Sequence, residues 1–198
     1  MPVYFYANWC KIAEKIERLF MVKKVLVITS SLREHGNSNA LANEFAKGAK
    51  EAGNSVEVVS LAGKNIAFCR GCLACQKTLK CVINDDAIQI AEKMKNANVI
   101  AFATPIYYYS VCGQLKTMLD RANPLFASDY KFTDIYLLAS AADDAKSAMD
   151  GAVSDITGWA SCFEKCSLKG VVRGVGATDI GDISQEAIDQ AYKMGKLA

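Results

Sequence analysis

The chain has 198 residues, of which 52% are hydrophobic and 22% charged, a balance that excludes a disordered chain and suits one domain with a substantial core. Its net charge is only +2, so we expect no nucleic-acid partner. No apolar run approaches the roughly eighteen residues that cross a bilayer, so we expect no membrane-spanning segment.

Five short apolar runs alternate with segments of helical periodicity. We predict strands at 25–29, 55–61, 98–103, 134–140 and 168–175. We predict helices at 39–52, from Asp85 onward, at 113–121, from 144 to about 163, and at 184–196. Thr104-Pro105 is expected to end the third strand. This alternation predicts an α/β fold with a five-stranded parallel sheet and helices on both faces. We expect the sheet to be doubly wound, with the order 2-1-3-4-5.

The first 21 residues form a separate extension, ahead of a domain predicted to span 22–198. Trp9, Ile12, Ile16 and Leu19 recur at helical spacing among charged residues, which fits an amphipathic helical arm. The alternative is an extension of little consequence. The extension lacks the basic region and cleavage site of a secretory signal, so we expect a cytoplasmic protein.

A phosphate site is predicted between the first strand and the first helix. The polar residues there are Ser31, Arg33, Asn37 and Ser38. A helix start offers backbone N–H groups without partners and the positive end of the helix dipole, which together attract an anion. The alternative is that Asn37 or Ser38 only caps the helix. The glycine pattern of a dinucleotide-binding loop is absent from this segment.

An aromatic segment, Thr104-Pro105-Ile106-Tyr107-Tyr108-Tyr109-Ser110, follows the third strand. Three consecutive tyrosines cannot all point into one core, so we expect them to offer stacking faces and hydroxyl donors to a flat heteroaromatic ring. Packing against a neighbouring subunit is the alternative. Because strands one and three flank the switch point of a 2-1-3-4-5 sheet, the aromatic segment and the phosphate loop are predicted to lie side by side.

Four of the eight cysteines, Cys69, Cys72, Cys75 and Cys81, fall within thirteen residues. Four thiolates at this spacing can ligate a 4Fe-4S cluster. Tetrahedral zinc and a loop of free thiols are the alternatives, although zinc ligands usually form two separated pairs. His35 is the only histidine, so no Ser-His-Asp triad can form within the chain.

These motifs resemble the NAD(P)H-dependent FMN reductase family, which is flavodoxin-like, and its nearest branch is the iron–sulfur flavoproteins. The resemblance rests on Ser31-Leu32-Arg33 with Gly36-Asn37-Ser38, on the cysteine block ending in Asp85-Asp86, and on Thr104-Pro105-Ile106-Tyr107 with Gln114-Leu115-Lys116 and Asp120-Arg121. It implies that FMN phosphate is held by Ser31, Arg33, Asn37 and Ser38, and that the ribityl chain and ring contact Thr104, Pro105, Ile106, Tyr107 and Tyr108. Ser30 and Leu32 stand where Gly and Pro are usual.

The resemblance also implies the chemistry. We expect electrons to pass from NAD(P)H through FMN to a small-molecule or protein acceptor, with no catalytic side chain beyond the flavin. The alternative is an electron carrier that holds a 4Fe-4S cluster on the four clustered cysteines and serves a ferredoxin-like partner. A third interpretation is a binding module that has lost its flavin. The resemblance further implies a homodimer or homotetramer.

Overall fold

The computed structural model describes residues 22–198, so the proposed arm at 1–21 lies outside the described residues. Its strands are β1 (Lys24–Thr29), β2 (Ser55–Ser60), β3 (Val99–Tyr107), β4 (Ser110–Val111), β5 (Asp134–Ser140) and β6 (Ser167–Gly174). Its α-helices are α2 (Asn37–Glu51), α3 (Cys75–Thr78), α4 (Asp86–Asn96), α5 (Gly113–Arg121), α6 (Asp150–Ser161) and α7 (Gln185–Leu197). Two 3-10 helices are η1 (Asn123–Ala127) and η2 (Lys146–Met149). Within 22–198, no helix is both long and apolar enough to span a membrane.

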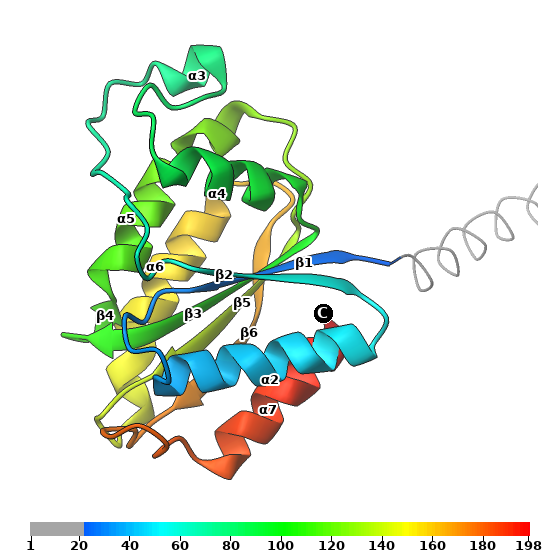
Figure 1. The fold of residues 1–198 in the computed structure, drawn as a ribbon, viewed down its shortest axis with the longest axis vertical. Helices are drawn as coiled ribbons and strands as arrows, with labels where there is room; N and C mark the ends of the chain where they lie inside the picture. The colour runs from blue at the N-terminus through cyan, green and yellow to red at the C-terminus, as the bar shows by residue number, and fades with distance from the viewer. Residues whose placement is uncertain (1–21) are drawn as a thin grey trace, which may run out of the picture.

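The strands form a sheet whose parallel part runs β2-β1-β3-β5-β6 (Figure 1). Counted among the parallel strands alone, this is the predicted order 2-1-3-4-5. The additional strand, β4, folds back antiparallel onto the end of β3. The α/β class and the doubly wound topology are therefore confirmed.

Helices cover both faces of this sheet, with α2 and α7 on one side and α4, α5 and α6 on the other (Figure 1). The position of β1 between the two layers of helices explains why its apolar run is continuous. Val25 and Val27 pack under α2 in one core cluster, whereas Leu26 and Ile28 pack in the opposite cluster with α4 and α5. A strand buried on both faces needs apolar side chains at every position.

Strand β3 continues beyond Pro105, contrary to the prediction that this proline ends the strand. Pro105 still pairs with Ser140 of β5. The carbonyl of Ala103 faces β1, because it accepts a 2.9 Å hydrogen bond from Ser30 N. Residues two apart in a strand point their backbone groups the same way, so Pro105 also faces the side where β1 has ended. Its missing N–H therefore costs no ladder hydrogen bond.

Helix α6 begins at Asp150 rather than near residue 144. Before it, the Asp143 carboxylate accepts a 2.8 Å hydrogen bond from Ala145 N, a local turn that competes with helix formation. The chain then passes through η2 before α6 starts.

Candidate functional site

The amino terminus of α2 is open toward the carboxyl edge of the sheet. The N-cap residue is Gly36 in an extended conformation, and no side chain caps the helix. The alternative that Asn37 or Ser38 acts as the cap is therefore wrong. No acidic residue occupies the first turn, so nothing there opposes an anion. Ser38 Oγ is buried and has no hydrogen-bond partner among the described residues, which leaves it available to a ligand.

The loop leading to this helix is compact. Ser31 is buried, and its hydroxyl accepts a 3.1 Å hydrogen bond from Arg33 N. Gly36 closes the loop, because a Cβ atom at this position would lie 2.6 Å from Ser31 Oγ. Glycine is therefore the residue that allows the serine hydroxyl and the helix start to approach each other.

Two of the predicted phosphate residues also hold the loop between β6 and α7. The Asn37 amide donates to Asp179 O at 2.8 Å and to Ala177 O at 3.3 Å, and it accepts from Gly181 N at 3.0 Å. Arg33 Nη1, on an exposed side chain, lies 3.5 Å from Thr178 O. Sequence reasoning missed residues 177–181, because contacts across some 140 residues leave no local pattern. The Asn37 side chain is thus occupied by the protein, so a phosphate would meet its backbone N–H.

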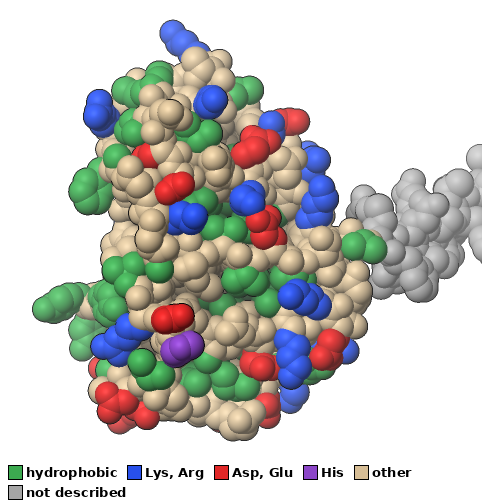
Figure 2. Space-filling view, viewed as in Figure 1, with side chains coloured by type: hydrophobic (Ala, Val, Ile, Leu, Met, Phe, Trp, Pro, Cys, Tyr) green, Lys and Arg blue, Asp and Glu red, His purple; other side chains and the backbone are tan. Residues whose placement is uncertain are grey.

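The tyrosine segment forms a hairpin in which Tyr108 and Tyr109 are the two turn residues between β3 and β4. Both adopt left-handed backbone conformations, with φ of 48° and 65°. Such two-residue turns favour Asn-Gly, and a left-handed non-glycine residue costs about 1–2 kcal/mol. Tyr108 is fully exposed, and Tyr107 and Tyr109 are more than half exposed. In Figure 2 a hydrophobic projection stands at the left edge, where Figure 1 places this hairpin.

Helix α6 braces the hairpin. The Asp155 carboxylate accepts hydrogen bonds from Ser110 Oγ at 2.5 Å and from Val111 N at 3.4 Å. Gly151 allows the close approach, since a Cβ there would lie 2.1 Å from Tyr109 O. The strained turn is therefore held by packing and by one charged acceptor.

Buried hydrogen bonds join the loop between β1 and α2 to the segments that carry the tyrosine hairpin. The two therefore lie side by side, as predicted. Ser30 Oγ donates to Ala103 O at 3.0 Å and lies 3.1 Å from the Cys112 thiol. Thr104 is fully buried, and its hydroxyl accepts from Cys112 N and donates to Pro105 O. A ligand contact from Thr104 would therefore use its backbone.

The four clustered cysteines line one small cavity beside α5 and η1. The group comprises Cys69, Cys72, Cys75 and Cys81. The first two are exposed, Cys75 is buried and accepts from Asn123 Nδ2 at 3.1 Å, and Cys81 is half-buried. Across 22–198, no three His, Cys, Asp or Glu residues gather closely enough for a single metal ion. The cavity of about 20 Å³ has room for roughly one water, so a 4Fe-4S cluster requires the exposed segment to move outward.

Beneath this cavity lies a buried ion pair between Arg121 of α5 and Asp85, the N-cap residue of α4. Arg121 Nη1 and Nη2 lie 2.6 and 2.8 Å from the two Asp85 carboxylate oxygens. Burial opposes ionisation of Asp85, but the Arg121 hydrogen bond and the N–H groups of Ala67 and Ala87 outweigh it and lower the pKa of this carboxyl. The Asp85 hydrogen bond likewise raises the Arg121 pKa. Both side chains are therefore charged in the folded protein.

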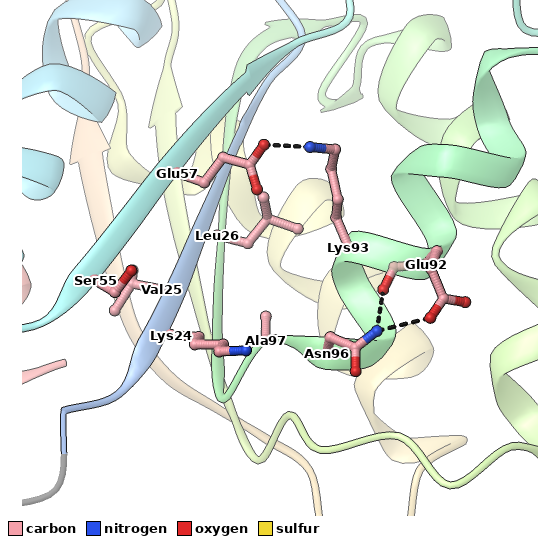
Figure 3. A pocket seen from close by; sticks show the side chains of 9 residues that line it. All are labelled: Lys24, Val25, Leu26, Ser55, Glu57, Glu92, Lys93, Asn96 and Ala97. Atoms are coloured by element: carbon pink, nitrogen blue, oxygen red, sulfur yellow. Dashed lines mark hydrogen bonds and ion pairs between the residues drawn. The ribbon is translucent and has the colours of Figure 1, made fainter.

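A further pocket lies at the opposite edge of the sheet, between the amino-terminal ends of β1 and β2 and the end of α4 (Figure 3). The Glu57 carboxylate and the Lys93 ammonium pair across it, and the Asn96 amide donates to Glu92. Ligands of open α/β sheets bind at the carboxyl ends of the strands, so this pocket is not part of the candidate site.

A doubly wound parallel sheet with an open helix start at its switch point is a flavodoxin-like fold. The family model for NADPH-dependent FMN reductase matches residues 23–161, and the chain belongs to this family of oxidoreductases, in its iron–sulfur flavoprotein-like branch.

Curated relatives bear the name iron–sulfur flavoprotein. One from Methanocaldococcus jannaschii is 40% identical over 102 residues, covering 52% of this chain and 53% of that protein. Another, from Methanosarcina thermophila, is 34% identical over 99 residues, covering 50% of this chain and 52% of that protein. The chain therefore spans about half the length of the curated relatives it matches.

Solved structures share the fold over most of the chain. An NAD(P)H:quinone oxidoreductase from Methanothermobacter marburgensis has a TM-score of 0.68 at 15% identity, covering 89% of this chain and 98% of that one. An FMN-dependent NADH-azoreductase from Bacillus anthracis, solved in complex with FMN, has a TM-score of 0.61 at 14% identity, covering 88% of this chain and 96% of that one. At these identities the likeness shows the fold alone.

Proposed function

We propose that this protein binds FMN at the carboxyl edge of the sheet and passes electrons from NAD(P)H through it to an acceptor. One observation carries the proposal: the uncapped start of α2, with the unpartnered Ser38 hydroxyl, lies beside a braced aromatic hairpin. This edge thus offers an anion site and stacking faces, as a mononucleotide with a flat ring requires. The family, and the FMN complex of the related fold, support the same cofactor.

Different residues of the site contact different parts of FMN. Ser31, Ser38 and the first backbone N–H groups of α2 hold the phosphate, while Asn37 and Arg33 keep the 177–181 loop beside it. The segment from Thr104 to Tyr108 contacts the ribityl chain and ring, and the exposed tyrosines also suit contact with a second subunit of a homodimer or homotetramer. FMN supplies hydride and electron transfer when bound, so the chain provides orientation and electrostatics.

The experiment is FMN titration of the full chain, followed by anaerobic addition of NADH or NADPH. We expect quenching of FMN fluorescence, loss of the oxidised-flavin absorbance with at least one nucleotide, and turnover with a quinone or dye. Protein that stays colourless after incubation with FMN and desalting would refute the proposal.

A second candidate function is electron transfer through a 4Fe-4S cluster on the four clustered cysteines. The observation that favours it is the donor set, because four thiols surround one cavity with a buried cation beneath. The Arg121 charge is balanced by Asp85, so the four thiols, and not a free cation, support this candidate. The names of the curated relatives support the cluster. Flavin reduction by a reduced ferredoxin, with inertness to both nucleotides, would favour the carrier over the NAD(P)H-dependent enzyme.

Replacing Cys72 with Ala should abolish bound iron and sulfide while leaving FMN affinity unchanged. A cluster that loses one of its four thiolate ligands is expected to assemble poorly. Anaerobic metal and sulfide analysis measures the first effect, and FMN titration measures the second. The matched control is Cys162→Ala, which also removes an exposed thiol but lies outside the cavity. Equal iron in both variants would contradict the assignment.

Replacing Asp155 with Ala should weaken FMN binding roughly tenfold and lower the free energy of unfolding by about 1–2 kcal/mol. The change removes a charged acceptor of two hydrogen bonds, each worth about 1.5–3 kcal/mol, and relief of the two left-handed turn residues, about 1–2 kcal/mol each, offsets much of that loss. FMN titration and urea unfolding measure the two effects. Asp189→Ala, on the exposed side of α7, should change neither by more than about 0.5 kcal/mol.

A further inference from the structure

An open pocket of about 540 Å³ lies between the segment that follows β2, residues 61–68, and the exposed face of α5. Figure 1 shows this segment leaving β2 and passing α5 on its way to α3. Pockets of about 300–1,000 Å³ hold small organic ligands. The volume therefore suits a nucleoside or a group of similar size, and none of the lining residues belongs to the set proposed to bind FMN.

The pocket adjoins the proposed flavin site on both of its walls. Leu61 N donates a 2.8 Å hydrogen bond to Thr29 O, at the end of β1 where the phosphate loop starts. On the other wall, Gly113 begins α5 two residues after Val111, which pairs with Ile106. Ile106 belongs to the segment proposed to contact the flavin ring. A ligand that extends from the ring into the pocket would therefore follow the carboxyl edge of the sheet.

The pocket offers a face on which an aromatic base can stack. Phe68 lines it and is 81% exposed. The neighbouring lining residues Leu61 and Ile66 are buried and half-buried, so they form an apolar floor. An aromatic side chain that stays outside the core beside apolar walls can cover the face of a heteroaromatic ring.

The charges of the pocket favour one anionic group. Lys116 Nζ lies 2.6 Å from Asp120 Oδ1, so these two charges balance each other. Lys64 is exposed and forms no ion pair among residues 22–198, which leaves its ammonium group available to a phosphate. The turn that carries Lys64 is held by a 3.2 Å hydrogen bond from its N–H to Leu61 O. No acidic residue in the first turn of α5 opposes an anion.

We propose that this pocket binds the adenosine end of NADPH, with Phe68 on the adenine and Lys64 on the 2′-phosphate. The inference rests on the proposed function, because it assigns the binding site of the electron donor. Adenine supplies the flat ring, and the 2′-phosphate supplies an anion that NADH lacks. A basic side chain near the ribose is the usual partner of this phosphate. The pocket therefore makes NADPH the preferred donor.

The direct test is calorimetric titration of the FMN-loaded full chain with 2′,5′-ADP, which carries the 2′-phosphate, and with 5′-AMP, which lacks it. We expect wild type to bind 2′,5′-ADP about tenfold more tightly than 5′-AMP. Lys64→Ala should remove this difference. Lys77→Ala, which changes an exposed lysine outside the pocket, should retain it. Wild type that does not bind 2′,5′-ADP, or a Lys64→Ala variant that keeps the preference, would overturn the inference.

Steady-state kinetics give a second readout. The ratio of kcat/KM for NADPH to kcat/KM for NADH should fall about tenfold in Lys64→Ala and stay the same in Lys77→Ala. Phe68→Ala should raise KM for both nucleotides, since both carry adenine. A Lys64→Ala ratio equal to that of wild type would contradict the role of Lys64.

Failure of the proposed function is measured separately, by FMN titration. Protein that binds FMN and oxidises NADH but does not bind 2′,5′-ADP would refute this inference alone. Protein that binds no FMN would refute the proposed function and, with it, the assignment of an electron donor to the pocket.

Discussion

Replacing Ser31 with Asp should lower FMN affinity by about a thousandfold. The substitution places a carboxylate at a buried position of the loop that leads to the start of α2, where the phosphate is proposed to bind. Two unit charges about 4 Å apart repel by about 4 kcal/mol near a protein surface, and each 1.36 kcal/mol is a factor of ten. Titration of the variant with FMN, followed by fluorescence quenching, measures the change.

The matched control is Ser31→Asn, which has the same shape as Asp without its charge. Both side chains can accept the hydrogen bond that Arg33 N donates to Ser31 in wild type, so the loop geometry is retained in each. We expect Ser31→Asn to keep most of the FMN affinity and Ser31→Asp to lose it. Equal FMN affinity in the two variants would show that the phosphate does not bind at this loop.

Replacing Asp85 with Ala should lower the free energy of unfolding by about 3–5 kcal/mol. The variant leaves the Arg121 guanidinium buried without a counter-ion. Removing one partner of a buried ion pair is strongly destabilising, because the remaining charge is buried and uncompensated. It also removes the cap of α4 and the acceptor of Ala67 N. Domains of this size are stable by about 5–15 kcal/mol, so the loss is a large fraction of the total. Urea unfolding measured by circular dichroism gives the value.

Asp86→Ala is the control, because it removes a neighbouring carboxylate from the same helix start. Asp86 accepts one hydrogen bond, from Asn65 N, and has no buried cationic partner. We expect Asp86→Ala to cost about 1 kcal/mol. A similar loss in both variants would show that the helix start, and not the ion pair with Arg121, carries the effect.

The same ion pair predicts the pH dependence of stability. The pKa of Asp85 is lowered in the folded state, so its stabilising contribution is complete above the unfolded pKa of about 4 and is lost as the pH falls through the folded value. Wild type should therefore lose stability steeply below about pH 4. Asp85→Ala, being less stable at neutral pH, should show a shallower decline in acid unfolding series.

Local patterns were sufficient for the fold. The apolar runs, such as Val25 to Thr29, and the helical spacing of Leu41, Phe45 and Ala49 depend only on which faces are buried, and the structure confirms both. The alternation of strands and helices predicted a parallel sheet, and the strand order was that of the flavodoxin-like doubly wound arrangement. The continuation of β3 through Pro105 did not, because it depends on where the neighbouring strand β1 ends.

The sequence by itself determined the fold class, the two loops at the switch point and the cysteine block, because each of these features depends on residues that lie close together along the chain. Only the tertiary structure decided that Asn37 fastens residues 177–181, that Asp155 braces the tyrosine hairpin, and that Arg121 lies buried against Asp85 beside the cysteine cavity. These contacts join segments 36 to about 140 residues apart, and hydrogen bonds between such segments depend on how the elements pack rather than on any periodicity.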